Sequence, residues 1–83
     1  METITNFSSS NDLIWLKGMG LSSLTYLHGG LSALTATGHA QAVFDNASNV
    51  LYIDTAGSGT ANMEVKLAGV QDTNLNSSNF IVS

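Results

Sequence analysis

The stretch HAQAVFDNASNVLYIDTAGSGTANMEVKLAG, residues 39–69, contains three short apolar runs separated by two polar turns. Turn-forming residues cluster at DNASN (45–49) and GSGT (57–60), and no proline interrupts the runs between them. In the last run, apolar residues alternate with Glu64 and Lys66, which is the period of a strand with one buried face. Three adjacent strands joined by short turns predict an antiparallel meander.

Further strands are expected on either side of this meander. TITNF (3–7) alternates in polarity, LIWL (13–16) is apolar on both faces, and FIVS (80–83) closes the chain after the polar loop at 71–79. A short run that is apolar throughout favours a strand covered on both sides, so we expect Trp15 in the core. The predicted core is lined by Val43 or Phe44, Leu51, Ile53, Val65, Leu67 and Phe80, beside Trp15.

The region 17–38 is the least readable part of the sequence. Its leucines recur every three or four residues before Gly29 and Gly30, which permits one short helix near 21–28. Eighty-three residues make a single small domain. We therefore predict an all-β fold over 1–83, a small β-roll or sandwich-like cap. Its entry strands lie in 1–16, an uncertain connection in 17–38, and the meander with a C-terminal tail in 39–83.

Composition narrows the range of partners. Lys17 and Lys66 are the only cations against six acidic residues, too few for a surface that follows nucleic acid phosphates. No apolar run approaches the roughly 20 residues of a membrane span. The chain has no cysteine, which excludes disulfides and thiolate chemistry. The start METITNFSSS lacks the basic and apolar regions of a classical signal peptide.

The segment from Asp54 to Asn62 has the outline of a calcium loop. Calcium takes about six to eight oxygen ligands, usually with several carboxylates, but this segment holds one carboxylate, three hydroxyls and one amide. The simpler interpretation is a hairpin in which Gly57 and Gly59 supply positive φ and Asp54 accepts turn hydrogen bonds. We predict no metal and no cofactor, with Asp54 and Asn62 as the weak calcium candidates.

The histidines give no ligand signature. His28 and His39, combined with Asp12 or Asp45, would supply metal-binding side chains, but their spacing matches no known pattern. A Ser-His-Asp set is easily assembled on paper from a serine-rich chain and carries no information. We predict that the protein is not an enzyme.

Several short motifs occur in a recognisable order. They are FD (44–45), LYID (51–54), the glycine turn at 57–59, LAGV (67–70) and NFIV (79–82), preceded near the start by Ile4, Phe7, Asp12, Ile14 and Leu16. This order and spacing resemble the C-terminal end of bacterial RTX-type proteins secreted by type I systems, of the hemolysin and serralysin kind. The resemblance covers about two thirds of the chain and leaves out 17–38.

The sequence also departs from that family's pattern. Glu2, Asn6 and Asn79 stand where the family usually has aspartates, and the glycine-rich calcium-binding repeats are absent from these residues. The chain therefore resembles the cap that follows a β-roll, not the roll itself.

The resemblance implies a non-enzymatic, secreted, extracellular capping domain. In the family, the extreme C-terminus belongs to the signal that the type I export machinery reads, which here implies Asn79, Phe80, Ile81, Val82 and Ser83. The alternative is a small stand-alone β protein that binds a partner, or forms a homo-oligomer, through exposed sheet edges. Glycine-aspartate repeats encoded directly upstream would favour the first interpretation, and a stop codon there would favour the second.

Overall fold

The computed structural model describes residues 2–4, 7–8, 12–16 and 23–82. The regular elements of this part of the chain are short strands and three single-turn 3₁₀ helices, which confirms the predicted all-β class. In chain order the elements are β1 (Glu2–Ile4), β2 (Ile14–Leu16), β3 (Thr25–Leu27), η1 (Leu31–Ala33), β4 (Gln41–Asp45), β5 (Val50–Asp54), β6 (Met63–Leu67), η2 (Asp72–Asn74), η3 (Ser77–Asn79) and β7 (Phe80–Val82).

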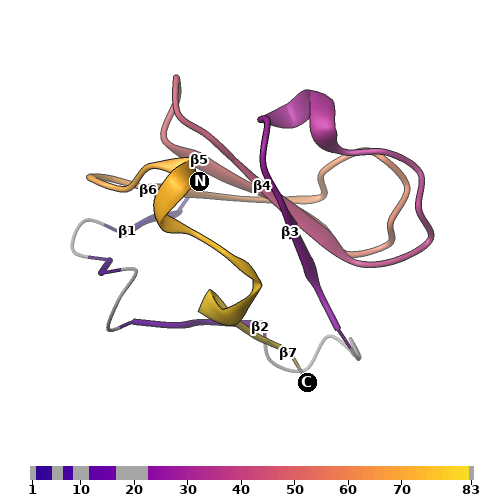
Figure 1. The fold of residues 1–83 in the computed structure, drawn as a ribbon, viewed down its shortest axis with the longest axis horizontal. Coiled ribbons are helices and arrows are strands. Elements are labelled where there is room, and N and C mark those ends of the chain that lie inside the picture. The colour runs from indigo at the N-terminus through magenta and orange to yellow at the C-terminus, as the bar shows by residue number, and fades with distance from the viewer. Residues whose placement is uncertain (1, 5–6, 9–11, 17–22, 83) are drawn as a thin grey trace.

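The strands form two sheets (Figure 1). The larger has five strands in the order β1-β6-β5-β4-β3, and the smaller pairs β2 with β7. Strands β4, β5 and β6 are antiparallel neighbours, so the predicted meander is confirmed. The remaining pairs, β1 with β6, β3 with β4 and β2 with β7, are all parallel. The first and the last of these join segments distant in sequence, whereas β3 and β4 are consecutive strands.

One face of the large sheet carries the main core. Because side chains alternate between faces, Phe44, Leu51 and Ile53 point to the same side, and all three are buried. Burying a side chain of this size stabilises a fold by about 1.5–3 kcal/mol. The full cluster of buried residues is Leu16, Tyr26, Ala42, Phe44, Leu51, Ile53, Leu67, Val70 and Leu75.

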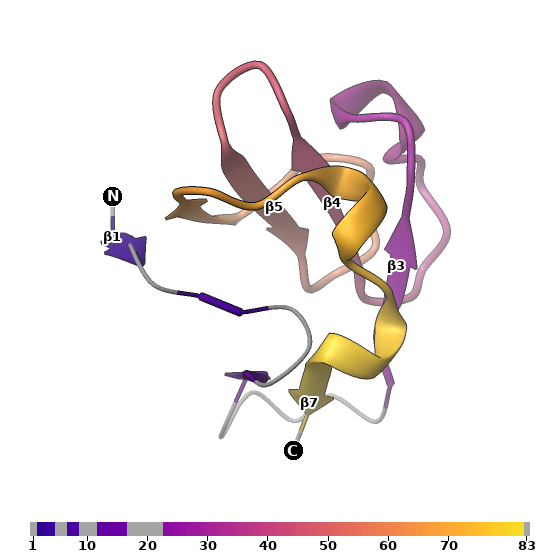
Figure 2. The ribbon, with the colours of Figure 1, turned by 60° about the vertical axis from the view of Figure 1, so that its left-hand side comes forward.

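The segment after β6 covers this core face. It crosses in front of β4 and β5, and then descends through η3 to the small sheet (Figure 2). Val70 and Leu75 reach into the core from this segment, while Phe80 and Val82 pack against its margin. The closing part of the chain therefore completes the core in place of a second full sheet.

The opposite face of the large sheet has buried residues of its own. Val43 and Val50 are buried there, together with Gln41 and Asp54. The turn η1 packs against β4, and Leu34 and Ala40 that follow it are also buried. The Gln41–Asp54 pair and the connection between β3 and β4 thus form a second buried region, on the face away from the main core.

Two predictions were wrong. Residues 25–27 form strand β3 in place of the short helix expected near 21–28, because pairing with β4 satisfies their backbone; residues 21–22 lie outside the described part of the chain. Trp15 is not in the core but 57% exposed, since β2 is covered on one side only. There Ile14 and Leu16 face the core, while Leu13 and Trp15 face outward.

None of the helices in the described ranges is long and apolar enough to cross a membrane.

Candidate functional site: the Asp54 hairpin and the closing segment

Asp54 ends strand β5, and its carboxylate has no exposed surface. One carboxylate oxygen accepts hydrogen bonds from the Ser58 backbone N–H at 3.1 Å and the Ser58 hydroxyl at 3.4 Å. The other accepts from the Gly59 backbone N–H at 2.7 Å and from the Gln41 side-chain amide at 2.9 Å. The predicted role of Asp54 as a turn acceptor is confirmed.

These hydrogen bonds set the charge state of Asp54. Burial by itself raises the pKa of this carboxyl, because it removes the charged form from water. The hydrogen bonds from Gln41, Gly59, Ser58 and Gly57 outweigh burial, and the pKa of Asp54 lies below its ordinary value. The carboxylate is therefore ionised at neutral pH, and its charge is held by protein donors.

The hairpin loop packs tightly on the segment before β4. Gly57 and Gly59 both have positive φ, at 68° and 93°, as predicted. The Gly57 carbonyl accepts a hydrogen bond from the Gly38 N–H at 3.0 Å. A Cβ atom on Gly57 would lie only 2.2 Å from the His39 backbone nitrogen. Only glycine fits at this crossing of two backbones.

Asn62 closes the loop beside Thr55. Its side-chain oxygen accepts from the Thr55 N–H at 2.9 Å, and its amide nitrogen donates to the Thr55 hydroxyl at 2.8 Å. The two weak calcium candidates, Asp54 and Asn62, thus have separate sets of protein partners. Within the described ranges, no three His, Asp or Glu side chains gather as a metal would require.

The closing segment, residues 68–82, runs through η2 and η3 and ends in strand β7. Asn79 is buried, and its side-chain oxygen accepts from the Asn76 N–H at 2.9 Å, which fixes the turn η3 immediately before β7. Phe80, Ile81 and Val82 then pair with Ile14, Trp15 and Leu16 in parallel register. Phe80 and Val82 are half-buried, but Ile81 is 39% exposed. Ser83 of the predicted signal set lies outside the described residues.

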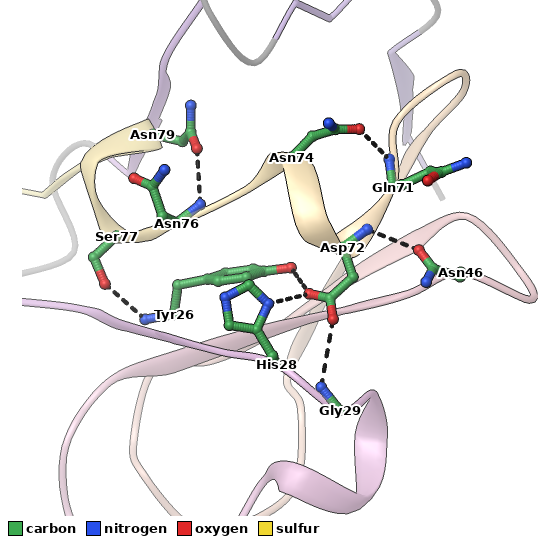
Figure 3. A network of polar contacts seen from close by, with 10 residues as sticks. All are labelled: Tyr26, His28, Gly29, Asn46, Gln71, Asp72, Asn74, Asn76, Ser77 and Asn79. Atoms are coloured by element: carbon green, nitrogen blue, oxygen red, sulfur yellow. Dashed lines mark hydrogen bonds and ion pairs between the residues drawn. The ribbon is translucent and has the colours of Figure 1, made fainter.

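A polar network centred on Asp72 attaches this segment to the sheet (Figure 3). The Asp72 carboxylate accepts the Tyr26 hydroxyl at 2.5 Å and pairs with His28 Nδ1 at 3.1 Å. Its second oxygen accepts from the Gly29 N–H at 3.4 Å. The Asp72 N–H donates to the Asn46 side chain at 2.8 Å, so η2 is joined to both β3 and the β4–β5 turn.

Tyr26 links this network to the core. Its ring is buried, and it stacks on Phe80 with ring centroids 5.7 Å apart. Burial, followed by the hydrogen bond to Asp72 and the negative charge of that carboxylate, raises the pKa of Tyr26 well above its usual range. The Tyr26 backbone N–H donates to the Ser77 hydroxyl at 3.1 Å, so η3 also holds the outer edge of β3.

The structure does not bring together the histidines and aspartates that were considered as a metal site from the sequence. His28 meets Asp72, not Asp12 or Asp45. Asp12 accepts from the Ser8 N–H, and Asp45 accepts from Ala47 and Ser48 within its own turn. His39 is exposed, at the crossing with Gly57.

Sequence reasoning missed Tyr26 and Asp72. The only signal was the spacing of the polar residues in QDTN (71–74) and NSSN (76–79). In each run, an amide side chain stands three residues after the cap position, as in a capping box, and both boxes are present in η2 and η3. That pattern places two consecutive turns, but it does not name the partner of Asp72.

Comparison with known proteins adds no assignment. No family model matches the chain, and neither the curated proteins nor the solved structures give a match.

Proposed function

We propose that this domain is the C-terminal cap of a bacterial secreted protein of the RTX type and that its closing segment is read by a type I exporter. In this role the domain has no catalytic activity. It ends a larger β structure, and the address for export lies in the tail at residues 79–83.

The proposal rests on one observation: residues that carry the family resemblance occupy positions where this backbone demands them. Asp54 is the buried acceptor of the hairpin, and Gly57 leaves no room for a side chain. Gly69 has a φ of 80°, in the left-handed region that favours glycine. A motif order built from such positions supports a shared fold, and the resemblance then supports the shared role.

In the tail, Ile81 can be changed without removing a buried core side chain. Asn79 is buried and Phe80 stacks on Tyr26, so changing either disturbs folding. Ile81 is 39% exposed and lies opposite the exposed Trp15. Ile81→Asp therefore alters the chemistry of the tail while leaving the buried side chains in place.

A fusion experiment tests the export role. A reporter protein is joined ahead of this chain and expressed in bacteria with and without a type I exporter. The reporter should reach the medium only when the exporter is present. Ile81→Asp should abolish that export, because it places a charge in the apolar tail.

Leu31→Asp is the matched control. Leu31 is 46% exposed, belongs to η1 and lies far from the tail in sequence, so the same change there should leave export intact. Thermal melts of both purified domains establish that each variant is folded. A reporter that stays inside the cell with the unchanged tail would refute the export role and favour the stand-alone partner-binding module.

A further inference from the structure

A second feature lies on the other side of the sheet from the main core. A pocket of about 310 Å³ opens between β3 and the connection that follows η1. Its walls include Ser23, Thr25 and Leu27 on one side and Thr35 and Thr37 on the other, with Gln41 among its lining residues. This volume is at the lower end of the ~300–1,000 Å³ range of small-molecule sites.

Gln41 gives the pocket a fixed polar group. The residue is 98% buried, as only 2% of its surface is exposed. Its side-chain nitrogen donates to the Thr35 carbonyl at 2.6 Å and to the Asp54 carboxylate at 2.9 Å. Neither acceptor has a proton to give, so the orientation of the amide is determined: the nitrogen faces these two groups.

The oxygen of the same amide is then the atom left for a ligand. Both amide hydrogens are engaged, and the ionised Asp54 behind them polarises the amide toward a stronger acceptor. Thr25 is the register partner of Gln41 on the neighbouring strand, so its hydroxyl lies on the same face of the sheet. The lining residues thus supply one amide oxygen and several hydroxyl groups, of which the Thr37 hydroxyl is already bonded to the His39 backbone.

The charge of the pocket selects the class of ligand. Among the described residues that line it there is no Lys, Arg, Asp or Glu, and His39 is the one histidine. The Asp54 carboxylate behind Gln41 is already bonded to protein donors and does not line the pocket, so neither a phosphate nor an ammonium group finds a counter-charge among these lining residues. Hydroxyl groups, which both donate and accept, match the amide oxygen and the threonine hydroxyls.

We propose that this pocket binds a small neutral polyhydroxylated ligand of monosaccharide size, oriented by the Gln41 side-chain oxygen and the Thr25 hydroxyl. The site is independent of the export role, because it shares no residue with the closing segment.

The test is an NMR titration of the whole chain, labelled with ¹⁵N, with D-glucose, D-galactose and D-mannose in turn. At least one sugar should give saturable shifts, in the millimolar range, for the backbone amides of 23–27 and 33–41 and for the Gln41 side-chain amide. Ethanolamine and inorganic phosphate are titrated for comparison and should give none.

Two matched pairs of variants locate the site. Ala33→Leu fills the pocket and should abolish the shifts, while Ala47→Leu, the same change on the exposed β4–β5 turn, should preserve them. Thr25→Val removes one lining hydroxyl at constant shape and should weaken binding severalfold, while Thr73→Val in η2 should not.

The Thr25 pair keeps the test decisive if Ala33→Leu fails to fold. Absence of saturable shifts with all three sugars would overturn the proposal. Equal sugar binding in Thr25→Val and Thr73→Val would also overturn it, as would preferential binding of ethanolamine or phosphate. None of these results depends on export of the fusion protein.

Discussion

The meander β4–β6 and the peripheral strands β1, β2, β3 and β7 are held together in different ways. Strands of the meander have five residues each and pair with neighbours in sequence across short turns. Peripheral strands have three residues each, and every pair that includes one of them is parallel. Local hydrogen bonding builds the first region, and side chains from distant segments assemble the second.

This difference indicates where each region is vulnerable. A parallel pair needs a long connection, so its ends must be brought together at an entropic cost, and a three-residue ladder supplies few hydrogen bonds to offset that cost. The Asp72 network and the packing of Tyr26 on Phe80 add stabilising contacts between the peripheral strands. The meander instead depends on its turns, above all on the crossing at Gly57.

The largest effect is expected from Gly57→Ala, which attacks the meander at its loop. The added Cβ would lie 2.2 Å from the His39 nitrogen and 2.6 Å from the Gly38 carbonyl carbon, both backbone atoms that cannot turn away. We expect the free energy of unfolding to fall by more than about 4 kcal/mol, measured by urea denaturation.

Gly69→Ala separates the clash from backbone strain. Gly69 also has positive φ, but nothing lies within 4 Å of its added Cβ. This variant should lose only about 1–2 kcal/mol, the cost of the left-handed conformation. Equal losses at the two glycines would show that the Gly57 crossing does not constrain the loop.

The next largest effect is expected from Tyr26→Phe, which tests how the peripheral strands are held. The change removes the hydroxyl that donates to Asp72 but keeps the ring that stacks on Phe80. A hydrogen bond to a charged group contributes about 1.5–3 kcal/mol, and urea denaturation should register a loss of that size. Tyr52→Phe serves as the control, because Tyr52 lies on the face of the large sheet away from the main core. Its free energy of unfolding should stay within about 0.5 kcal/mol of that of the unchanged protein.

Acid should weaken the meander through Asp54. Its pKa in the folded chain lies below the ordinary value of ~3.9, so the ionised carboxylate stabilises the fold above about pH 4. This contribution is lost as the pH falls through the lower, folded-state pKa. Asp54→Asn lacks the titrating group, and the stability gap between the two proteins should therefore narrow on acidification. Parallel curves of unfolding free energy against pH would contradict this role.

Calcium should have the smallest effect. Protein donors already satisfy both oxygens of Asp54, and Asn62 is engaged with Thr55. Thermal melts in excess chelator and in millimolar calcium should coincide, because a bound ion would raise the midpoint by mass action. A rise of many degrees would identify a cation site and make the hairpin a calcium loop after all.

The same contrast explains what could be predicted from sequence. The meander was predictable because alternation and turn residues are local signals, and Asp54, Gly57 and Gly59 have the roles expected of them. The parallel pairs were not predictable, because no local sequence pattern indicates that β2 pairs with β7. Trp15 was misplaced because an apolar run does not reveal whether a second layer covers its outer face.

The candidate site was only partly predictable for a similar reason. A buried turn aspartate follows from a strand that ends before glycines, but the Gln41–Asp54 pair requires the register of β4 on β5. Tyr26 and Asp72 meet only after the closing segment has folded back across the sheet. Contacts of that kind depend on tertiary structure and leave no periodic trace in the sequence.

The pairing of β2 with β7 also has a kinetic consequence. Ile14 and Phe80 come from nearly opposite ends of the described chain, so a ribosome has made almost the whole domain before this ladder can begin to form. Contacts at such separation slow folding, while the meander needs only its own short turns. The nascent chain should therefore form the hairpins early and capture residues 80–82 last, which leaves the tail accessible during that interval.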